Sequence, residues 1–171
     1  METLLFIPSI DTRHAQGIIS SRIGLMADAH AFEHTFNFFD YVEKFTQGTR
    51  ISCVLIDEAQ FLMKIQVLQL TRIVDDLKIP VLAYGLRSDF MGEPFEGSKY
   101  LLNWADELTE IKTICHCGKK ATMNLRMDGQ GKILREGEQI EIGGNDRYIA
   151  LCRQHFIKGN ILSSQQVVNQ V

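Results

Sequence analysis

Two acids, Asp57 and Glu58, follow directly on an apolar run at residues 53–56, in the stretch SCVLIDEAQFL. A continuous run of branched apolar residues is typical of a strand that helices cover on both faces. Ligands of such sheets bind beyond the carboxyl ends of the strands. The position therefore favours an Asp57 that holds Mg²⁺ and a Glu58 that acts as a general base, as in phosphoryl-transfer proteins. The alternative is a solvated acidic turn, or Asp57 as the N-cap of a helix that starts near Gln60.

A phosphoryl-transfer site also needs a loop that binds phosphates. The 171 residues contain neither G-x-x-x-x-G-K-[ST] nor a G-x-G-x-x-G motif after a strand. Gly17, Gly24 and Gly48 have no Lys-Ser or Lys-Thr pair at the required spacing. The sequence thus carries the acids of a nucleotide site without its phosphate-binding loop.

A second group of residues has the side chains of metal ligands. It consists of two pairs late in the chain, Cys115-x-Cys117 and Cys152-x-x-His155. Three thiolates and one imidazole fill the tetrahedral shell of Zn²⁺ and leave no open position, which is typical of a structural site. The C-x-C spacing is tighter than the commoner C-x₂-C, and His116 is a rival ligand. Free cysteines and surface histidines without a metal are the alternative.

The composition excludes several classes of partner. With 45% hydrophobic residues, 171 residues supply one good core and a small appendage. A net charge of -3 without a Lys/Arg-rich run argues against nucleic acid or a membrane as partner. No apolar stretch approaches the roughly 18 residues that cross a bilayer, and no basic leader precedes the first apolar residues. We expect a cytoplasmic protein with reduced cysteines, of which Cys53 packs inside its strand.

Apolar periodicity predicts strands that alternate with helices. This pattern indicates a parallel α/β sheet with right-handed crossovers. Residues 87–98 are expected to be irregular, and an ordered stretch follows at residues 100–113. The expected strands are residues 4–7, 51–56 and 81–86, the last introduced by Pro80, and the expected helices are residues 27–45 and 61–77.

After Thr113 the sequence changes to short strands, turn residues and closely spaced Cys and His. Asp128-Gly129 lies between alternating segments and predicts a hairpin. We place a domain boundary near residue 112. The expected organisation is an α/β core at residues 1–112, a metal-binding domain at residues 113–158 and a C-terminal tail at residues 159–171.

Five motifs in this order and spacing resemble the type II thymidine kinases: DEAQF, GLRSDFMGEPFEGS, CHC, IGGNDRY and CRQHF. The resemblance extends from about residue 4 to residue 156, and IDTR near the start is similar to the family's D-x-R segment. It implies a P-loop-type parallel α/β core with a small zinc-ribbon-like lasso domain. The implied activity is transfer of the γ-phosphoryl group of ATP, with Mg²⁺, to the 5′-hydroxyl of thymidine or deoxyuridine, a salvage step that supplies DNA synthesis. Family members are usually homotetramers.

The resemblance also accounts for the missing loop. Family members open with a strand, a loop ending in Gly-Lys-Ser and a helix, and this chain begins where their second strand begins. We therefore expect an N-terminally truncated core whose Met1 is an internal methionine. Because two apolar strand edges would be exposed, the 171 residues alone are expected to aggregate and to show no measurable kinase activity. An N-terminal extension of roughly 30 residues, one strand-loop-helix unit, should restore solubility and kinase activity. Expression of the two lengths tests this expectation.

The resemblance assigns catalytic roles. Glu58 matches the base that accepts the proton of the 5′-hydroxyl, and Asp57 matches the acid that positions Mg²⁺ through water. Arg13 matches a residue near the phosphates, where a guanidinium stabilises the transferring phosphoryl group; an ordinary surface arginine is the alternative. The residues expected at the ATP and magnesium site are Asp11, Asp57, Glu58, Ala59 and Gln60.

The resemblance also assigns a nucleoside site. Phe90 matches the position that stacks on the pyrimidine, although an anchor packed on the core is the alternative. Residues 139–148 match a flexible lasso that reads the thymine edge with backbone groups, and Gly143-Gly144 permits a close approach. The zinc site would anchor both ends of the lasso. The residues expected to contact thymidine are Leu86, Phe90, Gln139, Ile140, Glu141, Ile142, Gly143 and Tyr148.

Two other functions compete with the kinase. One is a truncated paralogue without catalysis that keeps a nucleoside pocket or an oligomer interface. The other is a zinc-stabilised interaction protein that binds no nucleotide. An in-frame Gly-Lys-Ser loop in the DNA upstream would favour the enzyme, whereas stop codons there would favour the others.

Overall fold

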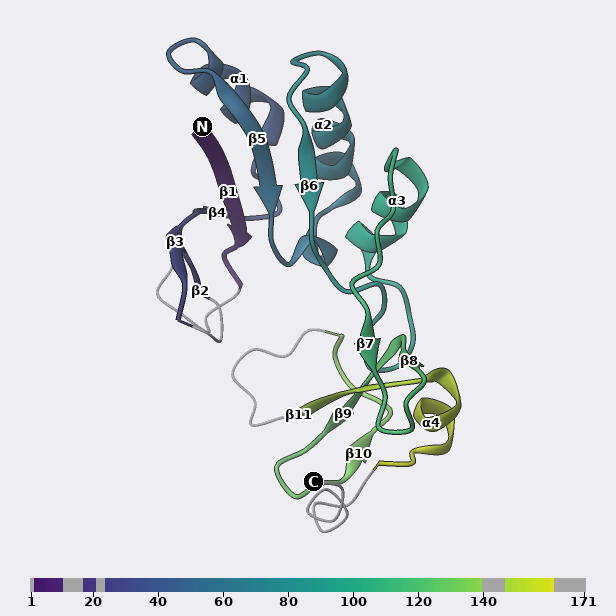
Figure 1. Ribbon diagram of the computed structural model, residues 1–171. Coiled ribbons are helices and arrows are strands. Elements are labelled where there is room, and N and C mark those ends of the chain that lie inside the picture. The colour runs from purple at the N-terminus through teal and green to yellow at the C-terminus, as the bar shows by residue number, and fades with distance from the viewer. Residues whose placement is uncertain (1, 11–16, 21–23, 140–146, 162–171) are drawn as a thin grey trace. The chain divides into compact units, whose positions relative to one another are not determined.

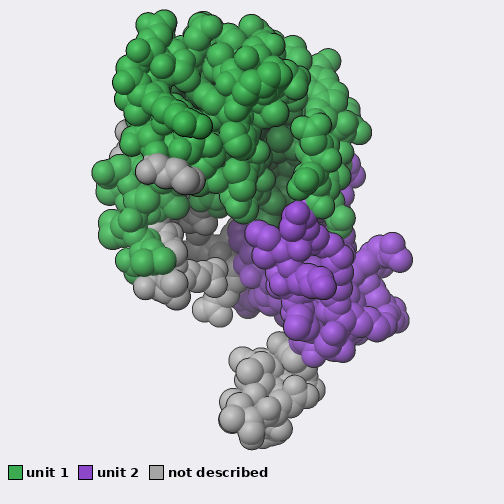
Figure 2. Space-filling model, turned by 45° about the horizontal axis from the view of Figure 1, so that its top comes forward, with its two compact units in different colours: residues 1–87, 94–108 green, residues 88–93, 109–171 purple. Residues whose placement is uncertain are grey.

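The computed structural model describes residues 2–10, 17–20, 24–139 and 147–161 of the chain (Figure 1). Contacts divide the chain into two compact units. The first is Met1–Arg87 with Pro94–Leu108, and the second is Ser88–Glu93 with Thr109–Val171 (Figure 2). The segment Ser88–Glu93, which the sequence analysis assigned to the α/β core, thus belongs to the second unit.

A parallel sheet of four strands forms the centre of the first unit, in the order β4-β1-β5-β6 among the described residues (Figure 1). The predicted α/β class with a parallel sheet is confirmed. A separate antiparallel pair, β2 with β3, lies between β1 and β4 in sequence. The strands are β1 (Glu2–Pro8), β2 (Ile18–Ser20), β3 (Met26–Asp28), β4 (His30–Phe32), β5 (Ile51–Ile56) and β6 (Val81–Ala83).

Helices α1 (Phe38–Thr46) and α2 (Lys64–Asp75) contribute apolar side chains to the core over this sheet. Alternate strand residues are buried there, as period-two geometry requires. Their opposite-face neighbours Leu5, Cys53 and Leu55 are only half-buried. The continuous apolar run of β5 therefore does not have two equally covered faces in the described structure, as the sequence had suggested. The buried core includes Leu4, Phe6, Phe38, Val42, Val54, Ile56, Val67, Leu70 and Ile73.

The prediction of one helix over residues 27–45 was wrong, because only α1 is helical in that range. β4 forms instead and pairs in parallel with β1, with Phe6 opposite His30. Asn37 is the N-cap of α1, and its side-chain oxygen accepts a hydrogen bond from the N–H of Asp40 at 3.2 Å. Pairing with a distant strand has outweighed the local helical spacing, as tertiary contacts commonly do.

Two glutamines of α2 hold the turn between β4 and α1. Gln66 is fully buried, and its Nε2 donates to the carbonyl oxygens of Glu33 and Phe36 at 2.8 and 3.1 Å. Gln69 Oε1 accepts from the N–H of Phe38 at 3.0 Å. The buried amide of Gln66 is thus paired with backbone groups that a longer helix would have used for itself.

Other boundaries also moved relative to the predictions. A short 3₁₀ turn, η1 (Ala59–Phe61), precedes α2, and β6 ends at Ala83 rather than at residue 86. The ordered stretch expected at residues 100–113 is helical only where α3 (Glu96–Trp104) covers it, and residues 105–112 carry neither helix nor strand.

Gly97, in the first turn of α3, lies against η1. An added Cβ would lie 2.5 Å from the carbonyl oxygen of Ala59 and 2.9 Å from that of Gln60. Because backbone would have to move, Gly97→Ala is expected to lower the free energy of unfolding by about 1–3 kcal/mol, measured by urea denaturation. Gly48→Ala is the control, since a Cβ at Gly48 meets nothing within 4 Å. Equal stability of the two variants would contradict this packing.

The second unit contains a small antiparallel sheet in the order β10-β9-β11 (Figure 1). A second antiparallel pair, β7 with β8, and the short helix α4 complete its described part. Its core is small and includes two of the four candidate metal ligands, Cys115 and Cys152. The elements are β7 (Thr113–Ile114), β8 (Lys120–Ala121), β9 (Met123–Met127), β10 (Ile133–Leu134), β11 (Arg147–Leu151) and α4 (Arg153–Lys158).

The hairpin predicted at Asp128-Gly129 is confirmed as the connection from β9 to β10. Asp128 Oδ1 accepts from the N–H groups of Gln130 and Lys132, each at 2.9 Å. Gly131 supplies the positive φ, +84°, that the turn requires. No helix in the described part of the chain is long and apolar enough to cross a membrane.

Candidate active site and metal centre

Asp57 and Glu58 directly follow β5, at the carboxyl end of the parallel strands. Glu58 has a left-handed backbone, with φ 49° and ψ 41°, a conformation that few residues other than glycine adopt. Its N–H donates to Asp57 Oδ1 at 2.9 Å. Strained backbone of this kind concentrates at functional sites, so its presence at the ligand-binding edge of a parallel sheet marks Glu58 as a functional candidate.

Gln60 holds the Glu58 carboxylate in place. The Gln60 side chain is 2% exposed; its Nε2 donates to Glu58 Oε2 at 2.6 Å, and its Oε1 accepts from the N–H of Leu86 at 3.1 Å. A Cβ at Gly85 would lie 2.6 Å from Gln60 Oε1, so only glycine leaves room for this amide. Leu86 is held in turn by Ser98, whose hydroxyl donates to the Leu86 carbonyl.

A cavity of about 220 Å³ lies at the same edge of the first unit. Pro8, at the end of β1, and Phe32, at the end of β4, line it together with Phe61. Glu33 and His34 add polar groups to these apolar walls. A largely apolar hollow with a few polar groups at the carboxyl ends of parallel strands is the expected form of a ligand site.

Several predicted site residues fall in parts of the chain that the structure does not describe. Their roles stay predictions. They are Asp11 and Arg13 of the D-x-R segment, and Ile140, Glu141, Ile142 and Gly143 of the predicted lasso.

The other predicted thymidine contacts divide between the two units. Leu86 is in the first unit and is 43% exposed, whereas Phe90, Gln139 and Tyr148 are in the second. Phe90 is 1% exposed and Tyr148 is 55% exposed. Gln139 lies near Phe90 in the fold, because its Nε2 donates to Oδ2 of the neighbouring Asp89 at 2.9 Å. Contact of these four residues with thymidine stays a prediction.

Two residues beside Phe90 were not predicted as site residues from the sequence. Asp89 is 3% exposed, and its Oδ1 accepts from the N–H groups of Met91 and Glu93 at 2.8 and 2.9 Å. Arg126 is 2% exposed, and its Cζ lies 4.9 Å from the centroid of the Phe90 ring. An Asp shortly before a glycine is a recognised turn signal and could have indicated Asp89. For Arg126 the signal was a lone charge among the apolar residues of β9.

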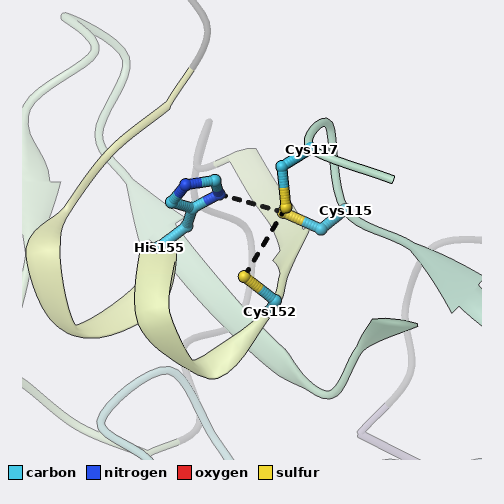
Figure 3. Close-up of side chains that lie close together, drawn as sticks. All are labelled: Cys115, Cys117, Cys152 and His155. Carbon is cyan, nitrogen blue, oxygen red and sulfur yellow. Dashed lines mark hydrogen bonds between the residues drawn. The ribbon is translucent and has the colours of Figure 1, made fainter. Parts of the chain in front are cut away.

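The four predicted metal ligands converge in the second unit (Figure 3). Their ligand atoms all lie within 4.8 Å of one another. Cys115 Sγ is 3.4 Å from His155 Nδ1, and Cys117 Sγ is 3.9 Å from Cys152 Sγ. Tetrahedral zinc with bonds of about 2.0 to 2.3 Å places its ligand atoms roughly 3.3 to 3.8 Å apart. This donor set and its spacing fit a closed site for a metal ion such as zinc.

Local turns explain how the C-x-C spacing suffices. Between β7 and β8 the N–H of Cys115 donates to the carbonyl of Lys119, and the N–H of Gly118 donates back to the carbonyl of Cys115, each at 2.8 Å. Gly118 takes φ +80°, which closes the turn tightly enough to bring both cysteine side chains to the cluster (Figure 3). Cys152 precedes α4 and His155 lies in its first turn, so this pair needs only helical spacing.

The ionisation of the Cys115 and Cys117 thiols favours the binding of a cation in the cluster. Burial raises the pKa of Cys115, but hydrogen bonds from the backbone at Cys117 and Cys152 and from the His155 side chain bring that pKa to about 6. The backbone at Lys119 lowers the pKa of Cys117, yet desolvation, the neighbouring thiols and the charge of Cys115 raise this pKa overall. One thiolate therefore forms at neutral pH and opposes the next, and a bound dication would relieve that repulsion.

His116, the rival ligand, is engaged elsewhere. Its ring stacks on His155 with centroids 4.3 Å apart and planes 5° from parallel, and its Nε2–H donates to the carbonyl of Asn160 at 3.1 Å. We expect His116→Ala to retain about one equivalent of zinc and His155→Ala to lose most of it, because only His155 belongs to the four-residue cluster. Metal analysis of protein purified without added zinc is the measurement. Release of the zinc by His116→Ala would show that the ligand set is wrong.

Comparison with known proteins extends the resemblance seen in the short motifs. A model of the Thymidine kinase family matches residues 1–156. Thymidine kinase from Legionella pneumophila (strain Lens) is 59% identical over 160 residues, which cover 93% of this chain and 77% of the relative. The Zymomonas mobilis subsp. mobilis thymidine kinase is 60% identical over 158 residues, covering 92% and 82%. The Vibrio parahaemolyticus thymidine kinase is 54% identical over 156 residues, covering 91% and 81%. Because the family match extends over both compact units, this chain belongs to the thymidine kinase family.

Proposed function

We propose that the chain is a thymidine kinase that transfers the γ-phosphoryl group of ATP to the 5′-hydroxyl of thymidine. The observation that carries the proposal is Glu58, held by Gln60 at the carboxyl edge of the sheet in a member of this family. A carboxylate whose position is fixed by a buried amide is suited to general-base chemistry, because the base must be in place before the proton moves.

In the proposed reaction, the Glu58 carboxylate accepts the proton of the 5′-hydroxyl as the 5′-oxygen forms a bond to the γ-phosphorus. The bond from that phosphorus to the β–γ bridging oxygen breaks, and ADP leaves. Mg²⁺ bound with ATP would neutralise the phosphate charge, and the Asp57 carboxylate offers the oxygen ligands that this ion prefers. Arg13 and Asp11 are proposed to act beside the phosphates, as the family resemblance implies.

We further propose that Zn²⁺ occupies the cluster of three cysteines and one histidine and stabilises the second unit. Such a lobe has little apolar core of its own, so metal binding would supply much of its folding free energy. Reduced thiols suit a cytoplasmic location. The homotetramer implied by the family resemblance is part of the proposal, and light scattering after size exclusion tests it.

The test is ATP- and Mg²⁺-dependent formation of thymidine monophosphate, with calorimetric thymidine binding measured in parallel. Both should be measured on the 171 residues and on the chain extended at its N-terminus by one strand-loop-helix unit of roughly 30 residues, as the family resemblance implies. Product from thymidine and deoxyuridine supports the proposal. Thymidine binding without product in either form would instead favour the nucleoside-binding module, and neither binding nor product would reject the proposal.

A further inference from the structure

Arg126 is a buried charge at the centre of the second unit's sheet. It lies on β9, opposite Leu134 of β10 and Tyr148 of β11. Its side chain is 2% exposed, its Cζ is 4.9 Å from the centroid of the Phe90 ring, and its Nη1 donates to the carbonyl of Glu138 at 3.4 Å. Burial of a guanidinium is costly unless its charge and N–H groups find partners. Arg126 finds two such partners in the Phe90 ring and the Glu138 carbonyl, and it thereby links these two segments.

The same two segments meet a second time through Asp89. The Asp89 carboxylate closes the turn that carries Phe90 and accepts a hydrogen bond from Gln139. Between the two connections, Gly137 lies against the ring: a Cβ there would be 3.9 Å from Phe90 Cζ. Residues 137–139 are therefore joined to the Phe90 loop directly by the hydrogen bond from Gln139 to Asp89. They are also joined to it indirectly by Arg126 of β9, which contacts both the Phe90 ring and the Glu138 carbonyl.

We propose that Arg126 is a positioning residue for thymidine, acting through Phe90. This inference rests on the proposed function and on the sequence-based prediction that Phe90 stacks on the thymine base. An aromatic ring has two faces, and the guanidinium lies over one of them, so only the opposite face is left for a base. The Phe90 ring is 1% exposed in this structure, so a base reaches that face only when the groups that cover it move aside. Arg126 thereby determines which face of Phe90 meets the substrate and fixes the ring against residues 137–139.

The geometry requires arginine in particular. A planar guanidinium lies over a ring while its N–H groups reach a carbonyl at its edge, and Arg126 makes both contacts. The ammonium of lysine is a compact point charge without a planar fork, so it cannot lie flat against the ring while its edge reaches the carbonyl. Arg126→Lys therefore keeps the charge but loses the positioning, which separates this role from general electrostatic attraction.

The experiment is calorimetric binding of thymidine to the zinc-loaded chain and to the variants Arg126→Lys and Arg126→Met. We expect thymidine to bind about 10- to 30-fold more weakly to both, the scale of a desolvated cation–ring contact. Zinc content and circular dichroism should match the parent. The matched control is Arg135→Met, because Cζ of Arg135 lies 4.8 Å from the ring of a different aromatic residue, Phe156. Thymidine binding should be unchanged in that variant.

A double-mutant cycle tests whether Arg126 acts through Phe90. In a Phe90→Leu background, Arg126→Lys should change thymidine affinity by less than about 2-fold, because the ring to be positioned is gone. The inference is overturned if the effects of the two substitutions on thymidine affinity are fully additive. It is also overturned if folded Arg126→Lys and Arg126→Met bind thymidine as tightly as the parent. Either result leaves the proposed function unaffected. If neither the 171 residues nor the extended chain binds thymidine, the proposed function fails, and this inference fails with it.

Discussion

Glu58→Gln is expected to lower the turnover number for thymidine by about 10²- to 10⁴-fold while thymidine affinity stays within a few-fold of the parent value. The substitution keeps the size of the side chain, and the amide oxygen can still accept the hydrogen bond that Gln60 Nε2 donates to Glu58. It removes only the ability to take up a proton. The loss therefore appears in turnover rather than in binding. Steady-state rates and calorimetry on the form of the chain that turns thymidine over, as given or extended, measure the two quantities.

Glu43→Gln is the matched control for this experiment. Glu43 is an exposed residue of α1, and the same exchange there removes one carboxylate without touching the carboxyl edge of the sheet. Its turnover should equal that of the parent. Near-normal turnover of Glu58→Gln would move the general base to another residue, and a large rise in the KM for thymidine at constant turnover would give Glu58 a binding role instead.

Removal of the metal is expected to unfold the second unit. Purified protein should contain about one equivalent of zinc, and a strong chelator or the change Cys152→Ser should remove it. Two of the four ligands, Cys115 and Cys152, belong to the small buried core of this unit, so loss of the ion also disrupts its packing. Structural zinc contributes about 10 to 16 kcal/mol in small zinc-dependent folds, more than a core of this size replaces. Amide resonances of the second unit should collapse, whereas those of the parallel sheet should remain.

Cys53→Ser provides the control for metal removal. Cys53 lies in β5 of the first unit, half-buried, with its sulfur 3.4 Å from the hydroxyl of Thr3 and outside the metal cluster. This variant should keep its zinc. Zinc well below one equivalent in the parent protein, together with amide spectra that a chelator does not alter, would rule out a structural metal.

The sequence by itself determined the features that depend on near neighbours. The strand at residues 51–56, followed by Asp57 and Glu58, was predicted at its observed bounds, because a short apolar run ending in acids has few other solutions. The hairpin at Asp128-Gly129 followed from turn chemistry in the same way. The sequence also predicted that Cys115, Cys117, Cys152 and His155 lie together, because each pair is close in sequence and only one tight turn and one helical turn are needed to present them.

The tertiary structure alone decided the features that depend on distant partners. Residues 27–45 read as one helix, but β4 forms instead and pairs in parallel with β1, with His30 opposite Phe6, about 24 positions earlier in the chain. Gln60 Oε1 accepts from the backbone N–H of Leu86, 26 residues away, and this contact helps to hold the amide that donates to the carboxylate of Glu58. Arg126 covers Phe90 although the two residues are far apart in the chain. Local periodicity carries no information about such pairs, since the free energy that places them comes from burial and hydrogen bonding achieved only once the chain has folded.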